Sequence, residues 1–166
     1  MNLNEAMKIL NKYDPMPADD QLTQEIVDEY GVAIDYLKLN PHPSCIEPIL
    51  KSFGEYGGWG LYEEASLILT KFGINQVLPY LITALQSPQN GIRYWATHIA
   101  SDFADKQLLQ FLEVCIHDKI PDIRENTATA LGFMGGLQAL KVLEDALKVE
   151  SDPIVIESRE RNTFAI

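Results

Sequence analysis

The sequence predicts an all-α protein, a short right-handed α-solenoid made of stacked αα-hairpins. Three observations predict this fold class: a repeat with a period of 31 residues, apolar residues at helical spacing within each copy, and turn-forming residues between the two apolar stripes of a copy. A single hairpin cannot bury its own apolar face, so repeated hairpins stack and share one continuous core.

The repeat occupies residues 45–166 without an insertion. Its four copies are residues 45–73, 76–104, 107–135 and 138–166. Five columns keep their residue character through the copies: Leu50, Leu81, Leu112 and Leu143; Leu61, Ile92, Ile123 and Ile154; Phe53, Ala84, Cys115 and Ala146; Ala65, Ala96, Thr127 and Ser158; and Phe72, Phe103, Met134 and Ala165. We therefore expect four hairpins with equivalent core positions.

Apolar residues within a copy recur at the three- and four-residue spacing of a helix. In the third copy, the two inward stripes are expected to be Leu108, Leu112, Val114, Cys115 and Ile116, and then Ile123, Thr127, Ala130, Leu131 and Met134. Residues 87–91, 118–122 and 151–153 separate such stripes and contain proline beside Ser, Asp, Asn or Gly, which is typical of turns.

Residues 1–44 are expected to form an atypical helical cap within a single domain of residues 1–166. Within it we expect one helix at residues 4–13 and a proline-rich turn at residues 14–17. Residues 21–39 are expected to form one helix, or two helices with a break at Gly31. This segment lacks a clean 31-residue register, as expected for a terminal repeat that shields the stack from water.

The chain has 24 acidic and 13 basic side chains, which gives a formal net charge of −11. This charge disfavours binding to nucleic acid or to an anionic membrane surface, and it favours a basic protein partner. The first residues do not resemble a signal peptide, and no stretch is long and apolar enough to span a membrane. With only Cys45 and Cys115 available, we expect a cytoplasmic protein whose thiols are reduced.

Residues 122–135, DIRENTATALGFMG, followed by residues 139–143, ALKVL, resemble HEAT repeats, and most closely the short type found in phycobilisome-lyase-like proteins. The second copy keeps Ile92, Arg93 and Ala96 of this pattern, whereas the first copy has Tyr62 in place of the arginine. The resemblance implies a curved solenoid whose second helices line a concave, partner-binding side. It also implies that Arg93 and Arg124 tie adjacent repeats together.

The sequence offers no pattern for an enzyme, and we expect no cofactor and no metal site. HEAT-like hydroxylases bind iron through His-Glu dipeptides. In this chain, none of the three histidines, His42, His98 and His117, is followed by glutamate. The glycine-rich residues 54–60 lack the lysine of a P-loop, and there is no GxSxG element. Cys115 shares a column with apolar residues, which predicts a buried thiol rather than a nucleophile.

An acidic block at residues 13–37 is the first candidate for partner binding. It contains seven carboxylates and neither lysine nor arginine. Either it is a solvated cap that keeps the protein soluble, or it attracts a basic partner electrostatically. The partner-binding candidates within it are Asp19, Asp20, Asp28 and Glu29.

Residues 54–60 and the outer sides of the second helices are the other candidates. Residues 54–60 include four glycines with Tyr56 and Trp59. They form either a loose turn with Trp59 in the core or an adaptable binding loop with an aromatic anchor. Outward positions on the second helices are expected to include Tyr62, Glu63, Tyr94, His98 and Glu125, with Ser66, Thr97 and Ala128 beside them, whereas Trp95 is expected in the core.

These observations predict a non-enzymatic protein that binds one basic protein partner and is monomeric when free. The favoured hypothesis is an immunity-type inhibitor that neutralises a cationic bacterial toxin domain, such as a nuclease, by direct binding. The alternatives are a generic HEAT-repeat adaptor or assembly scaffold, or a bilin-lyase-like subunit.

Overall fold

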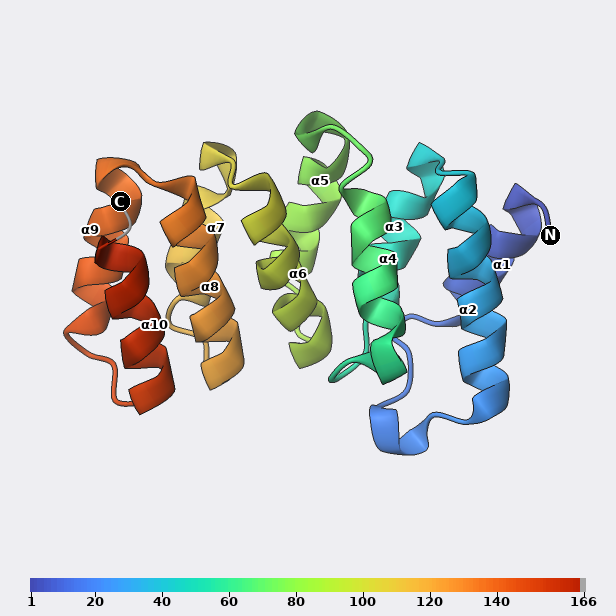
Figure 1. Cartoon of the computed structure of the whole chain (residues 1–166), viewed down its shortest axis with the longest axis horizontal. Coiled ribbons are helices and arrows are strands. Elements are labelled where there is room, and N and C mark those ends of the chain that lie inside the picture. The colour runs from blue at the N-terminus through green and yellow to red at the C-terminus, as the bar shows by residue number, and fades with distance from the viewer. Residues whose placement is uncertain (165–166) are drawn as a thin grey trace. The chain divides into compact units, whose positions relative to one another are not determined.

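The structure, a computed structural model, describes residues 1–164, and every regular element in this range is helical. The ten α-helices of the described range are α1 (Leu3–Lys12), α2 (Gln24–Leu39), α3 (Ile46–Ser52), α4 (Leu61–Leu69), α5 (Ile74–Leu85), α6 (Asn90–Phe103), α7 (Leu109–Cys115), α8 (Pro121–Met134), α9 (Gly136–Leu147) and α10 (Pro153–Phe164) (Figure 1). Short 3-10 turns precede α2, α3, α4 and α7. Successive helices form hairpins, which confirms the predicted α-solenoid of helical hairpins.

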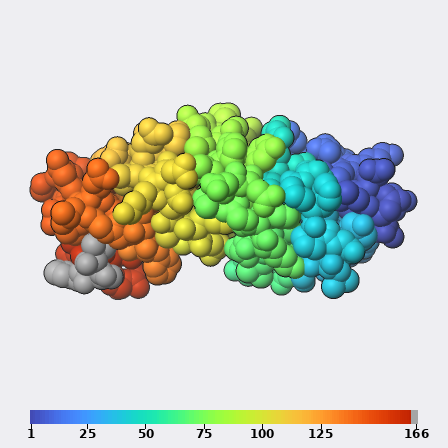
Figure 2. Space-filling model, turned by 90° about the horizontal axis from the view of Figure 1, so that it is seen from above, coloured from blue at the N-terminus to red at the C-terminus, as the bar shows by residue number. Residues whose placement is uncertain are grey.

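The chain divides into two compact units, an N-terminal unit of residues 1–95 and a C-terminal unit that begins at Ala96. In the N-terminal unit, α3 packs against α1 and α5, and α2 packs against α4, so first and second helices form separate layers (Figure 1). In the C-terminal unit, α8 packs against α7, α9 and α10. Within each unit, the side chains of neighbouring helices lie against one another (Figure 2).

Most of the repeat columns lie in the core, as predicted. The four leucines of the first column are at most 2 % exposed, and the columns that begin with Phe53 and Ala65 are also buried. Cys45 and Cys115 are both buried and form no disulfide. Ala165, the last member of its column, lies outside the described residues.

Two apolar residues that we expected to face inward are exposed. Val114 is 73 % exposed, because Leu108, Leu112 and Cys115 define the inward side of α7 and a 3.6-residue period places residue 114 on the other side. Ile154 is 66 % exposed in the first turn of α10, where the buried Val155 and Ser158 set the inward direction. The predicted inward position of both residues is therefore wrong.

The segment around Gly31 is a single continuous helix rather than two. The Thr23 hydroxyl caps α2 by accepting a hydrogen bond from the backbone N–H of Ile26 at 3.3 Å. A Cβ placed on Gly31 would lie 3.5 Å from the Leu61 side chain, so the backbone of α2 comes close to the start of α4 at this point.

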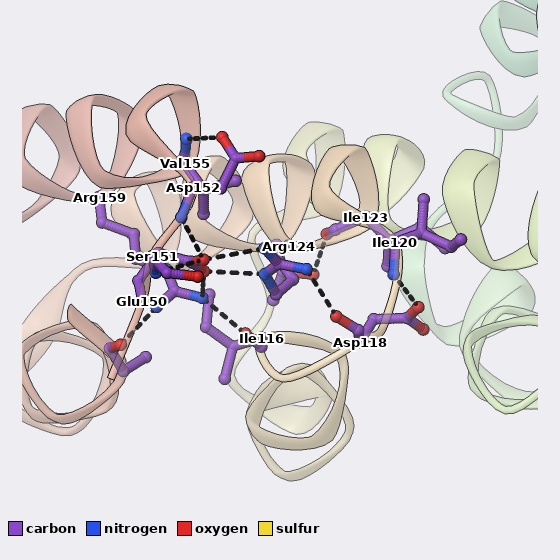
Figure 3. A network of polar contacts seen from close by, with 12 residues as sticks. Ile116, Asp118, Ile120, Ile123, Arg124, Glu150, Ser151, Asp152, Val155 and Arg159 are labelled. Carbon is purple, nitrogen blue, oxygen red and sulfur yellow. Dashed lines mark hydrogen bonds and ion pairs between the residues drawn. The ribbon is translucent and has the colours of Figure 1, made fainter. Parts of the chain in front are cut away.

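A buried ion cluster holds the C-terminal unit together (Figure 3). Arg124 donates to both carboxylate oxygens of Glu150 at 2.8 Å, and it also donates to the backbone carbonyl of Asp118 at 3.0 Å. Arg159, only 1 % exposed, pairs with Glu150 at 2.8 Å and donates to the carbonyls of Ile116 and Ala146. Arg124 thus ties adjacent hairpins, as the resemblance implies.

The same cluster perturbs the titration of Glu150. Hydrogen bonds from Arg124 lower the pKa of Glu150 from 4.5 to about 2, although burial of the carboxylate acts in the opposite direction. The backbone amides of Ser151 and Asp152 also donate to this carboxylate, at 2.9 and 3.0 Å. Arg93 donates to the backbone carbonyl of Ser87 and to the side-chain oxygen of Asn90, at the turn of its own hairpin.

Candidate protein-binding surface

Charge is segregated between the two helix layers of the N-terminal unit. The second helices, α2 and α4, carry six carboxylates and one lysine. The first helices, α1, α3 and α5, carry two carboxylates and three lysines. The part of the acidic block that lies in α2 therefore shares one acidic layer with α4.

The outward side of this layer combines carboxylates with apolar side chains. Helix α2 buries Tyr30, Ala33, Ile34 and Leu37, and α4 buries Tyr62, Ala65, Ser66, Ile68 and Leu69. The opposite sides are exposed, and they present Asp28, Val32, Asp35, Leu39, Glu63, Glu64 and Leu67, which we call the acidic face. Val32, Leu39 and Leu67 are 53 %, 84 % and 55 % exposed.

Contacts between the two helices join the acidic face into one surface. The ammonium of Lys38 pairs with Glu64 at 2.6 Å and with Asp35 at 3.8 Å. Lys71, just beyond α4, donates to the backbone carbonyl of Lys38. Lys38, the lysine of α2 and α4, is thus paired with carboxylates of the acidic face. Because the carboxylates outnumber this lysine, the net charge of the face is negative.

The four predicted carboxylates of the acidic block have different roles. Asp20 and Asp28 are exposed, and Asp28 accepts a hydrogen bond from Gln24 at 2.7 Å. Glu29 accepts hydrogen bonds from Lys12 and from the Tyr13 hydroxyl, both at 2.5 Å, and the bond from Lys12 is the main cause of its lowered pKa. Asp19 accepts hydrogen bonds from the backbone amides of Gly57 and Gly58 at 3.4 and 2.9 Å, so its carboxylate holds residues 57 and 58 in place.

Residues 54–60 form a loop that presents two aromatic side chains to solvent. Tyr56 is 73 % exposed and Trp59 is 53 % exposed, so the alternative that places Trp59 in the core is wrong. Both residues have positive φ, 66° and 54°, which non-glycine residues adopt only where the surroundings enforce it.

Three contacts hold this aromatic loop in place. The carboxylate of Asp19 binds two of its amides, and the indole N–H of Trp95 donates to the carbonyl of Tyr56 at 2.8 Å. Gly91 packs so closely that an added Cβ would lie 2.0 Å from the carbonyl oxygen of Gly54. The loop is therefore anchored, in contrast to the adaptable loop that its glycine content predicts.

Tyr62 does not belong to the outer surface, and its predicted outward position is wrong. Its ring is wholly buried and makes edge-to-face contacts with Tyr30, Phe53 and Trp95 at centroid distances of 5.5 to 6.3 Å. Burial raises the pKa of Tyr62 to about 12. The predicted register places Leu61 inward, but Leu61 is only half-buried and Tyr62 takes the inward position. Trp95, at 4 % exposure, lies in the core as predicted.

The remaining second-helix predictions have mixed outcomes. Glu63 and His98 are exposed, and Tyr94 and Glu125 are half-buried. Ser66, Thr97 and Ala128 are buried at 4 %, 0 % and 0 %, so their predicted outward positions are wrong. His98 and Glu125 belong to the C-terminal unit, whereas Tyr94 belongs to the N-terminal unit.

Three apolar residues of the acidic face, Val32, Leu39 and Leu67, are missing from the predicted site. The spacing of the sequence contains a signal for the first two. Tyr30, Ala33, Ile34 and Leu37 form an inward stripe at helical spacing, which leaves Val32 and Leu39 on the other side of the same helix.

The described residues form no group of three or more His, Cys, Asp or Glu side chains that could hold a metal ion. An open pocket of about 510 Å³ in the N-terminal unit is lined mainly by α3, α5 and the turn after α5, with Asp14, Pro15 and Ile92 completing its wall. Its charged residues include Glu47 and Lys51, which pair with each other at 2.9 Å. No helix in the described part of the chain is long and apolar enough to cross a membrane.

A sequence model of HEAT repeats matches residues 78–162, a segment that begins in α5 and ends in α10. Comparison with curated proteins finds no match. HEAT repeats are typical of non-enzymatic helical scaffolds that bind other proteins.

Proposed function

Because the chain belongs to the HEAT-repeat family, we propose that it binds one basic protein as an immunity-type inhibitor of a cationic bacterial toxin domain, such as a nuclease. In this proposal the free protein is a monomer in the cytoplasm and blocks the toxin by covering its basic surface. Membership of the family supports a role in protein binding. The charge distribution of this chain supports a basic partner.

The acidic face is the observation that carries the proposal. A nuclease attracts its substrate through a basic surface that recognises phosphates, and carboxylates on an inhibitor compete for the same charges. Segregated carboxylates also steer a basic partner to one side of the inhibitor and accelerate association. In this unit the other layer carries more lysines than carboxylates and offers no such attraction.

The anchored aromatic loop, residues 54–60, adds two exposed aromatic side chains, Tyr56 and Trp59, that can contact a partner. Tyrosine and tryptophan dominate the hot spots of protein interfaces, and a side chain that is ordered before binding loses less entropy in the complex. We assign direct contacts to Asp20, Asp28, Tyr56, Trp59 and Glu63, and an outer contact to Tyr94, all within the N-terminal unit. Asp19 and Glu29 support this surface from within the fold.

An assembly adaptor is a second candidate, favoured by an apolar surface in the C-terminal unit. Phe133 and Leu137, at the junction of α8 and α9, are 66 % and 85 % exposed. An adaptor would bind a second partner there, whereas the inhibitor hypothesis needs one partner at the N-terminal unit.

Affinity capture from the native host, followed by calorimetry with the purified partner, tests the proposal. We compare the wild-type chain with a variant carrying Asp20→Lys, Asp28→Lys and Glu63→Lys. The control variant carries Asp102→Lys, Glu113→Lys and Glu144→Lys, which change the net charge equally at exposed sites of the C-terminal unit.

The inhibitor hypothesis predicts one basic protein, bound one-to-one by the wild type and the control but not by the first variant. Capture of several partners would favour the adaptor. Capture of no basic protein, or equal loss of binding in both variants, would contradict the inhibitor hypothesis.

A further inference from the structure

The geometry of the acidic face points to the form of the partner segment as well as its charge. We propose that the outward side of α2 and α4 receives a cationic amphipathic α-helix, with its apolar side chains on Val32 and Leu67 and its lysines or arginines on the surrounding carboxylates. This inference rests on the proposed function and specifies which surface and which conformation it uses.

The apolar residues of the face lie on the outward sides of two neighbouring helices. The contact between Gly31 and Leu61 and the ion pair between Lys38 and Glu64 set α2 and α4 side by side along their lengths. Val32 and Leu67 are each more than half exposed on the outward side of this pair. A third helix can pack on such a surface with its axis about 8–10 Å away, because its rows of side chains fit between those of the helices below.

Carboxylates surround these apolar residues. Asp28 and Asp35 flank Val32 at positions i−4 and i+3 of α2, and Glu63 and Glu64 precede Leu67 on α4. Lys38 is the lysine of this layer, and it already pairs with Asp35 and Glu64. An apolar stripe bordered by acids is complementary to an apolar stripe bordered by bases, which is the pattern of a cationic amphipathic helix.

The backbone of the face favours a helical partner over an extended one. Helices α2 and α4 use their N–H and C=O groups internally, and they offer no strand edge to which an extended segment could add. An extended segment would therefore leave its own backbone groups without partners at the contact, whereas a helix satisfies them itself. Helix α2 has 16 residues, which gives a face about 24 Å long, enough for several turns of a partner helix.

Binding of synthetic peptides to the full chain tests this inference. The probe is a fluorescein-labelled peptide of lysine and leucine with an amphipathic helical pattern, measured by fluorescence anisotropy. One comparison peptide has the same composition in scrambled order, and another has a central proline that prevents the helix. We expect the amphipathic peptide to bind about tenfold more tightly than either, because only it places leucines and lysines on matching sides.

Two variants locate the contact on the chain. Val32→Ser combined with Leu67→Ser should abolish the tenfold preference for the amphipathic peptide and leave the weaker binding of the scrambled peptide in place. The control combines Val114→Ser with Leu137→Ser, which are at least as exposed but lie in the C-terminal unit, and it should keep the preference. Far-UV circular dichroism of each variant verifies that the fold is retained.

Equal binding of the three peptides, or equal loss of preference in both variants, would overturn the inference. The result of the peptide experiment can be distinguished from the result of the capture experiment, which tests the proposed function. If a basic protein is captured one-to-one but no peptide preference exists, the helix-docking mode fails and the inhibitor hypothesis stands. If the preference exists but no basic protein is captured, the inhibitor hypothesis fails and the docking face stands.

Discussion

The two units of the molecule contain the same number of acidic residues and use them differently. Residues 1–95 and residues 96–166 each have twelve. In the N-terminal unit, carboxylates gather on the outward side of α2 and α4 with exposed apolar and aromatic residues nearby. In the C-terminal unit, Glu150 is buried between Arg124 and Arg159 and joins three segments of chain. Placement, rather than net charge, separates an acid that recognises a partner from an acid that stabilises the fold.

Removal of the buried acid should have the largest effect on stability. Glu150→Gln leaves Arg159 buried without its ion pair, and breaking a buried pair in this way costs about 3–5 kcal/mol. Urea unfolding followed by circular dichroism measures the loss, and hydrogen exchange should locate it in residues after 96. Glu144→Gln, at an exposed position of α9, is the control. A loss no larger than that of the control would show that the cluster contributes little.

Acid should weaken the C-terminal unit. The pKa of Glu150 is lower in the folded chain, about 2, than its ordinary value of 4.5. Its contribution to stability is therefore complete above about pH 4.5 and is lost as the pH falls toward 2. Melting temperatures measured across this range should fall more steeply for the wild type than for Glu150→Gln. Parallel curves would contradict the assignment.

Gly58→Ala should destabilise the N-terminal unit by about 2 kcal/mol. Gly58 has φ of +55°, and an added Cβ would lie 2.6 Å from the buried Tyr62 ring. Gly57 has φ of −104°, and an added Cβ would meet the Gly60 nitrogen only at 4.0 Å, an ordinary van der Waals distance, so Gly57→Ala is the matched control and should be nearly neutral. Thermal unfolding compares the two, and similar losses would show that the constraint lies elsewhere.

Asp19→Ala should loosen the aromatic loop at a cost of about 1.5 kcal/mol, since it removes a charged acceptor from two backbone amides. Asp20→Ala removes the same charge from an exposed neighbour and should leave the loop intact. The readout is hydrogen exchange of Gly57 and Gly58. Unchanged protection of these amides in Asp19→Ala would contradict the anchoring role.

Trp59→Ala should have the smallest effect on stability, within about 0.5 kcal/mol, because the side chain is more than half exposed. Its effect on binding the basic partner should be at least about tenfold, as expected for an aromatic hot spot. Tyr80→Ala, on the first-helix layer of the same unit and 39 % exposed, is the control and should bind normally. Unimpaired binding of Trp59→Ala would remove the loop from the interface.

The hairpin pattern, the turns and most core columns could be predicted from the amino-acid sequence alone. These features depend on local period and turn chemistry, so Leu50, Leu81, Leu112 and Leu143 are buried as predicted. The acidic block could also be located from the sequence. That its α2 part shares one surface with α4 could not be predicted, because the contact of α2 with α4 is made between distant segments.

The direction of individual side chains and the pairing of charges, by contrast, depend on how distant segments pack. A helix turns each residue by about 100° relative to the one before it, so taking Leu61 rather than Tyr62 as inward placed Tyr62 on the wrong side. Asp19 and Asp20 are adjacent acids in the sequence, yet only Asp19 meets the amides of Gly57 and Gly58. Arg159 donates a hydrogen bond to the carbonyl of Ile116, which is 43 positions away in the sequence. Such partners are brought together by packing, and the local sequence does not encode them.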